Sequence, residues 1–218
     1  YKYRPDAGKG IFVYVLNSGI NAEHEEFEGR VIALRVFTGG LISDRSHGTH
    51  VAGIIGGATY GVAQKASIID VQVLAGRTGS TAKIIKGLEW AIDDIKRNGR
   101  VGEAVISMSL GGNRGRLHNY SETLVKEAID AGIPIIMAAR NRNMDSDTNS
   151  PGRVTAAITV GAMTKEYRRW EGPSLGPIVD IFAPGKGIIA AGSESNTALA
   201  TKTGTSVAAP HVAGVVLY

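Results

Sequence analysis

The chain has 218 residues and a formal net charge of +4, from 24 lysines and arginines against 20 acidic residues. It has no cysteine, which excludes a disulfide scaffold, a cysteine nucleophile and thiolate-bound metal centres. With 43% apolar and 20% charged residues, its composition is that of a globular protein and not of a disordered one. The 29 glycines are nearly twice the usual share of about 7%, which indicates many tight turns or close backbone approaches.

The charge and the two ends of the chain exclude further classes. A net charge of +4 over this length is a weak field, and the basic residues are scattered, so we expect no nucleic-acid partner. No run approaches 18 apolar residues, so we expect no membrane span. The start lacks the segments of a signal peptide and the end falls within an apolar run, so we expect a fragment or a processed form.

Short apolar runs, typical of strands buried on both faces, recur along the chain. They cover residues 11–16, 67–74, 104–108, 133–138, 156–160 and 178–182. Between them, residues 81–97 and 121–131 show apolar positions at helical spacing. Strands that alternate with helices predict an α/β fold with a mainly parallel central sheet and helices on both faces.

Polar residues follow several of these runs, at the sheet edge where such folds place their active sites. Asn17 follows the first run, Ser109 the third, and Asn141 comes shortly after the fourth. Two more motifs stand at expected helix starts, SHGTHVAG at 46–53 and TGTSVAAPH at 203–211. A serine and a histidine that each enter a helix suit nucleophilic acyl transfer, because a serine hydroxyl needs a base to take its proton.

Each of these residues alone has an ordinary structural explanation. Ser206 could cap a helix, His47 could be a surface or capping histidine, and Asn141 could be a turn residue. Their joint occurrence, each in the expected helix or strand context, favours the catalytic interpretation.

These motifs resemble those of the subtilisin-like serine proteases, and among them the proteinase K-like branch. HGTHVAG is similar to the histidine motif of the family, and GTSVAAPHVAG is similar to its serine motif. VISMSLGG, IVDIFAPG and YGVAQKASI resemble its framework segments, so the resemblance covers nearly the whole chain. It implies one peptidase domain of subtilisin-like fold over residues 1–218, incomplete at both ends.

The resemblance also implies catalytic roles. Ser206 matches the nucleophile, His47 the general base, and Asn141 the side-chain donor of the oxyanion hole. His50 and His211 belong to the same motifs, and we expect them to be structural.

Asn17 stands where the family has an aspartate. If its NH2 group donates to His47, the proton stays on the ring nitrogen that faces Ser206, which would cost about 10⁴ in kcat.

The substrate-binding residues that the resemblance implies are Gly79, Ser80, Thr81, Ser109, Leu110, Gly111 and Arg140. The first three match an edge that pairs with an extended peptide, and the next three match one wall of the primary specificity pocket. Arg140 replaces a glycine at the pocket border. It could fill the pocket, point to solvent or favour acidic substrates.

The resemblance implies no cofactor for catalysis. Asp180 matches a carboxylate that can bind structural calcium, with an acid that caps a strand end as the alternative. The expected partners are polypeptide substrates or proteinaceous inhibitors in extended conformation, and we expect a monomer. An extracellular location is expected from the family.

Two functions therefore remain open. The first is a serine endopeptidase that acts through an acyl-enzyme on Ser206 and is weakened by Asn17. The second is a catalytically dead pseudoprotease that retains a peptide-binding groove. Ser206, His47 and Asn141 favour the first, whereas Asn17 and Arg140 favour the second.

Overall fold

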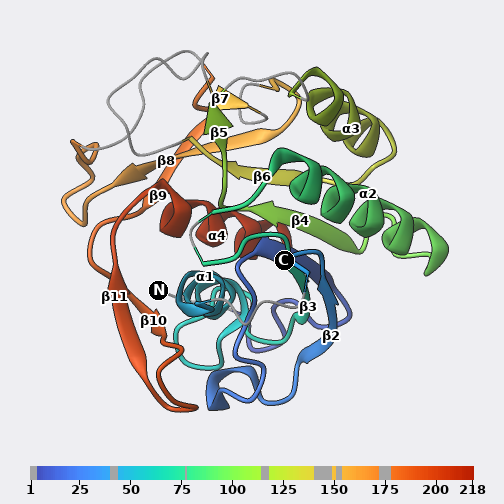
Figure 1. Ribbon diagram of the computed structural model, residues 1–218. Helices are drawn as coiled ribbons and strands as arrows, with labels where there is room; N and C mark the ends of the chain where they lie inside the picture. Colours follow the sequence, from blue (N-terminus) through green and yellow to red (C-terminus); the bar gives the residue numbers. More distant parts are fainter. Residues whose placement is uncertain are drawn as a thin grey trace.

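The computed structural model describes residues 4–39, 44–76, 78–113, 118–139, 149–150, 154–171 and 178–218. Figure 1 shows a central sheet with helices on both sides. In spatial order its seven strands are β2 (Val31–Val36), β3 (Ser67–Gln72), β1 (Phe12–Asn17), β4 (Ala104–Met108), β6 (Ile135–Ala138), β8 (Ile158–Met163) and β9 (Ile181–Pro184). Every pairing in this sheet is parallel. The predicted α/β fold with a mainly parallel sheet is thus confirmed.

In the described ranges, four α-helices cover the two faces of the sheet. α2 (Thr81–Arg97) and α3 (His118–Asp130) lie on one side, and α1 (Ser46–Gly56) and α4 (Thr205–Val216) lie on the other (Figure 1). The smaller elements are η1 (Glu25–Phe27) and two antiparallel pairs, β5 (Gly112–Asn113) with β7 (Asn149–Ser150) and β10 (Ile188–Ala191) with β11 (Leu199–Lys202). No helix in the described part of the chain is long and apolar enough to cross a membrane.

Alternate residues of each central strand face opposite sides of the sheet. In β1, Val13 and Val15 pack towards α1 and α4, whereas Tyr14 and Leu16 pack towards α2 and α3. This two-sided burial explains why the strands appear in the sequence as continuous apolar runs.

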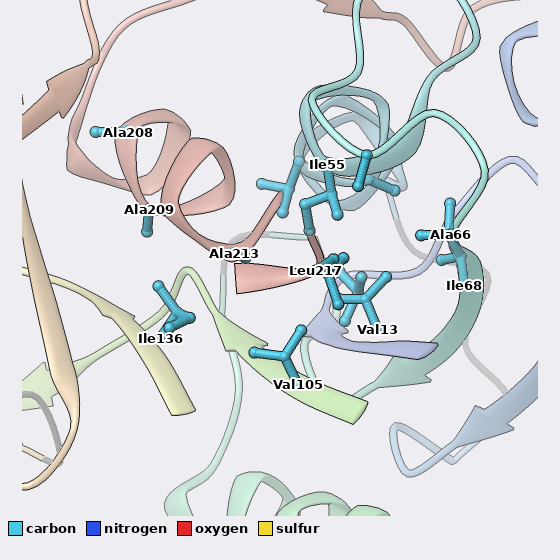
Figure 2. Packing of buried hydrophobic residues seen from close by; sticks show 14 of the residues in the cluster. Val13, Ile55, Ala66, Ile68, Val105, Ile136, Ala208, Ala209, Ala213 and Leu217 are labelled. Atoms are coloured by element: carbon cyan, nitrogen blue, oxygen red, sulfur yellow. The ribbon is translucent and has the colours of Figure 1, made fainter. Parts of the chain in front are cut away.

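The core on the α1 and α4 side is built from small helical residues set against branched strand residues. Figure 2 shows Val105 and Ile136 of the sheet facing Ala209 and Ala213 of α4, with Ile55 of α1 beside them. The small alanines let both helices approach the sheet and each other, and α1 and α4 are in contact. This packing brings the start of α1 and the start of α4, which carry the two sequence motifs, onto one face of the sheet.

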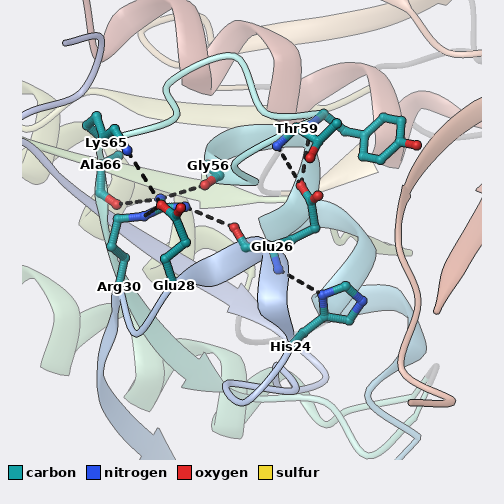
Figure 3. Close-up of polar contacts among 9 residues, drawn as sticks. His24, Glu26, Glu28, Arg30, Gly56, Thr59, Lys65 and Ala66 are labelled. Carbon is teal, nitrogen blue, oxygen red and sulfur yellow. Dashed lines mark hydrogen bonds and ion pairs between the residues drawn. The ribbon is translucent and has the colours of Figure 1, made fainter. Parts of the chain in front are cut away.

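The far end of α1 is held by Arg30, whose side chain is partly buried. Arg30 donates to the carbonyl oxygens of Gly56 at 2.6 Å, Ala66 at 3.2 Å and Glu26 at 2.9 Å (Figure 3). Burial lowers the pKa of Arg30 from its ordinary value. One side chain thus joins η1, the last turn of α1 and the segment that leads into β3.

Candidate active site

Asn17 ends β1 in the middle of the sheet and is fully buried. Its Oδ1 atom lies 2.7 Å from Nδ1 of His47 and accepts the Ser18 backbone N–H at 2.9 Å. Its Nδ2 atom is buried without a hydrogen-bond partner among the described residues. The structure therefore brings together Asn17 and His47, as the sequence predicts.

The Ser18 N–H decides which way the Asn17 amide points. A backbone N–H can only donate, so the atom of Asn17 that faces it must be the oxygen. The same oxygen faces Nδ1 of His47, so that nitrogen carries the proton, and Nε2 is left as an acceptor. This arrangement differs from the expectation that the Asn17 NH2 group would donate to His47.

His47 is the second residue of α1, and the start of this helix is fitted closely to the turn after β1. Gly48 N–H donates to Ser18 Oγ at 3.2 Å. A Cβ atom added at Gly48 would overlap the backbone of Gly19, so only glycine permits this approach. Asp44 caps the helix start by accepting the Ser46 N–H at 2.8 Å, a contact that lowers the pKa of Asp44.

Ser206 is the second residue of α4 and is half-buried. Gly204 precedes the helix with a φ of 148°, a conformation that favours glycine, and its N–H donates to Gly185 O at 2.8 Å. The nucleophile predicted from the sequence thus lies at a helix N-terminus, where free N–H groups favour a developing negative charge.

The other two motif histidines have structural contacts. His50 Nε2 lies 3.1 Å from Ile188 O and 3.0 Å from Ala200 O, which ties α1 to the β10–β11 pair. His211 Nδ1 lies 2.9 Å from Val207 O within α4. Burial lowers the pKa of both rings, so they stay neutral at physiological pH.

The predicted substrate-binding residues have different surroundings. Gly79, Ser80 and Thr81 lie at the surface or near it, and Ser80 caps α2 by accepting the Lys83 N–H at 3.3 Å. Ser109, Leu110 and Gly111 follow β4 directly, and exposure increases along them from buried to exposed. Arg140 and Asn141 lie outside the described residues.

Asp180 is exposed and precedes β9. Its Oδ2 atom accepts the Thr159 N–H at 2.8 Å, and its own N–H donates to Thr159 O at 3.0 Å. Within the described ranges, no group of three or more histidines and acids is placed to hold a metal ion. The contacts of Asp180 fit an acid at a strand end, and these residues do not by themselves identify a calcium site.

Sequence analysis missed Asp70, which lies next to this site. It stands within the apolar run at 67–74, and that lone acid in a buried strand was the available signal. Its side chain is buried, and Oδ2 accepts the Ile20 N–H at 2.8 Å. Burial raises the pKa of Asp70 to about 7, against smaller opposing effects of the Ile20 N–H and of Arg45.

Comparisons with known proteins show what the chain as a whole is similar to. A family model described as the subtilase family matches residues 8–218. Alkaline protease 1 of Emericella nidulans is 45% identical over 219 residues, covering 100% of this chain and 54% of that protein. An alkaline proteinase of Hapsidospora chrysogena is 43% identical with the same coverage. The chain thus spans about half the length of these curated relatives.

A solved structure extends the similarity to three dimensions. The crystal structure of a cold adapted subtilisin-like serine proteinase superposes with a TM-score of 0.90 at 38% identity. The match covers 100% of this chain and 77% of that one.

Proposed function

Because the chain belongs to the subtilase family, we propose that it is a serine endopeptidase that cleaves polypeptides through an acyl-enzyme on Ser206. The observation that carries the proposal is the contact between Asn17 Oδ1 and His47 Nδ1, which leaves Nε2 of His47 able to accept a proton. The relatives that are named alkaline proteases support the same class of reaction.

In the proposed reaction, Ser206 Oγ attacks the scissile carbonyl while its proton passes to Nε2 of His47. The tetrahedral oxyanion accepts hydrogen bonds from the Ser206 backbone N–H and from the Asn141 side chain. The His47 imidazolium then protonates the leaving amine. A water molecule, activated by the same base, hydrolyses the ester on Ser206.

Asn17 weakens this reaction because it is neutral. It fixes the His47 ring through Oδ1, but it cannot offset the positive charge that the ring acquires when it takes the proton from Ser206. Its Nδ2 is buried and has no hydrogen-bond partner within the described part of the chain, which favours the second candidate, a pseudoprotease that binds extended peptides without turnover.

The proposal also covers the substrates, the oligomeric state, the location and the domain organisation of the protein. The substrates and inhibitors are polypeptides bound in extended conformation, along residues 79–81 and beside 109–111. We further propose that the chain acts as a monomer, outside the cell, and as a single domain over residues 1–218. Calcium at Asp180 stays a prediction.

Covalent labelling tests the proposal. A serine-directed phosphonofluoridate should add its mass to the peptide that contains Ser206, and the protein should hydrolyse a peptide anilide. Ser206→Ala should lose both the label and the hydrolysis. Ser193→Ala, a matched half-buried serine in the loop after β10, should keep both. Peptide binding without labelling or turnover would instead support the pseudoprotease.

A further inference from the structure

Asp70 lies on the same face of the sheet as Asn17, on the neighbouring strand. The register of β1 and β3 pairs Val15 with Asp70 and Asn17 with Gln72. Val15 and Ile68 belong to the core on the α1 side, so by strand alternation Asn17 and Asp70 also face α1. Strand spacing and rise put the Cα atoms of Asn17 and Asp70 about 8 Å apart.

Buried polar side chains with unpartnered atoms lie on this face at three adjacent strands of the described residues. Asp70 on β3, Asn17 on β1 and Ser107 on β4 are all buried. Each has one atom without a hydrogen-bond partner among the described residues, namely Asp70 Oδ1, Asn17 Nδ2 and Ser107 Oγ. Buried polar atoms without partners reduce stability. Three of them on neighbouring strands, on the face of the sheet that α1 covers, therefore indicate a function.

The two unpartnered atoms of Asp70 and Asn17 are complementary. Oδ1 of Asp70 is an acceptor and Nδ2 of Asn17 is a donor, and the opposite end of the Asn17 amide contacts His47. The positive end of the Asn17 amide dipole, at Nδ2, therefore lies away from the His47 ring, and Asp70 shares its face of the sheet. A negative charge on Asp70 favours this orientation of the amide.

The Asp70 carboxylate is also tied to the turn that positions His47. Its Oδ2 accepts the N–H of Ile20, three residues after Asn17, and Gly19 in the same turn is packed against α1. The turn after β1, which positions His47, is thus hydrogen-bonded to the Asp70 carboxylate.

Few charges act on Asp70 from the elements around it. Arg45, just before α1, lowers the pKa of Asp70, and His47 lies two residues further along. From β2, Leu34 is its register partner, and Arg35 faces the opposite side of the sheet with Val71. From β1 it meets the neutral amide of Asn17, and its own strand adds Gln72, also neutral.

We propose that Asp70 is a positioning residue of the catalytic site, whose carboxylate supplies the negative charge that Asn17 lacks and so promotes proton acceptance by His47. This inference deepens the proposed peptidase function and rests on it for its effect on rate. Burial raises the pKa of Asp70 to about 7, so this support increases as the pH rises through neutrality.

The test compares Asp70→Asn with the parent protein by two measurements. In the first, NMR follows the titration of the His47 ring, which does not require turnover. Loss of the Asp70 charge should move the midpoint of that titration to lower pH. In the second, kcat/KM for a peptide anilide should fall about tenfold at pH 8.5 and stay nearly unchanged at pH 5.5, where Asp70 is protonated in the parent. KM should not change.

Two further variants separate this role from a structural one. Asp94→Asn removes a partly buried carboxylate of α2 on the other side of the sheet, and it should leave the His47 titration unchanged. In an Asn17→Asp background the charge is restored beside His47, so Asp70→Asn should then change kcat/KM less than twofold. Asp70→Ser, smaller and also neutral, should repeat the effect of Asp70→Asn.

The outcomes are distinct. An unchanged His47 titration in both Asp70 variants would overturn the inference, as would an equal loss of rate in the parent and in the Asn17→Asp background. If the parent hydrolyses nothing but its His47 titration responds to Asp70, the proposed function fails and the electrostatic role of Asp70 stands.

Discussion

The oxygen of the Asn17 amide, and not its nitrogen, faces His47 at a distance of 2.7 Å. The orientation is imposed by the neighbouring Ser18 N–H, which donates to the same oxygen. His47, the proposed general base, therefore keeps the tautomer that general-base catalysis needs, although the residue that holds it is neutral.

This relationship sets the size of the effect expected for Asn17→Asp. An asparagine that forces the wrong tautomer costs about 10⁴ in kcat. Here the tautomer is correct and only the charge is missing, so Asn17→Asp should raise kcat about 10²-fold. The measurement is kcat on an unselective peptide anilide, with peptide mass analysis to show that residue 17 of the parent is still amidated.

Asn21→Asp is the matched control, because it makes the same substitution four residues further along the chain. It should change kcat less than threefold. A gain near 10⁴ for Asn17→Asp would mean that the Asn17 amide donates to His47, in conflict with the contact to Ser18.

Gly48→Ala adds only one methyl group, but it should reduce both stability and kcat. The added Cβ would overlap the Gly19 backbone and move the start of α1 away from Asn17. We expect a loss of about 2 kcal/mol in the free energy of unfolding and at least a tenfold fall in kcat. Urea denaturation and initial rates measure the two effects.

Gly56→Ala, at the other end of the same helix, is the control. Its Cβ would come closest to the tip of the Ile68 side chain, at 3.2 Å, and would be in ordinary contact with Ala63 O and Arg30 Nη1, both at 3.5 Å. The free energy of unfolding should therefore change by less than about 1 kcal/mol. Equal effects of the two substitutions would contradict the importance of the Gly48 contact.

Arg30→Ala should destabilise the fold without touching the catalytic residues. It removes the donor that three carbonyl oxygens share, including that of Gly56 at the end of α1. We expect a loss of about 2–3 kcal/mol in the free energy of unfolding, measured by urea denaturation. Lys65→Ala removes an exposed partner of Glu28 and should cost less than about 1 kcal/mol. A similar cost for both variants would rule out the role assigned to Arg30.

Asp70→Asn should increase stability at alkaline pH. The pKa of Asp70 is about 7 in the folded protein, against about 4 in an unfolded chain. Between these values the folded state holds the proton that the unfolded state releases, so the parent loses stability as the pH rises from about 4 to about 7. At pH 8 the variant should therefore be more stable than the parent by about 4 kcal/mol, and near pH 4 the two should be alike.

The measurement is the difference in the free energy of unfolding between parent and variant at each pH. The buried histidines contribute equally to both proteins, so their contribution cancels in this difference. A constant difference from pH 4 to pH 8 would refute the raised pKa. An acid that lowers stability while it raises activity would behave as a functional group and not as a structural one.

Much of the fold could be predicted from the sequence because burial leaves a pattern. The continuous apolar runs predict the central strands, and the predicted helix at 81–97 matches α2 from Thr81 to Arg97. β2 was missed although its residues, VIALRV, are apolar at five of six positions, and it is an edge strand whose side chains are largely exposed. α1 and α4 are buried along most of their length and rich in glycine and alanine, so they show no apolar stripe, and only their motifs indicated them.

Part of the candidate site could be predicted from the sequence. Chain order and motif context predict Asn17, His47 and Ser206, and the structure places Asn17 against His47. The orientation of the Asn17 amide was not predictable, since it depends on a backbone N–H. Asp70 was missed for another reason: only the register of β1 and β3, which are 50 residues apart in the chain, places it beside Asn17.

The glycine at position 48 has a consequence for the thermal inactivation of this protein. Because α1 meets the turn after β1 through main-chain atoms, the spacing of His47 and Asn17 is set by the backbone of the core and not by a mobile side chain. Thermal inactivation should therefore coincide with the melting of the central sheet, without an earlier step in which the folded protein has lost its activity.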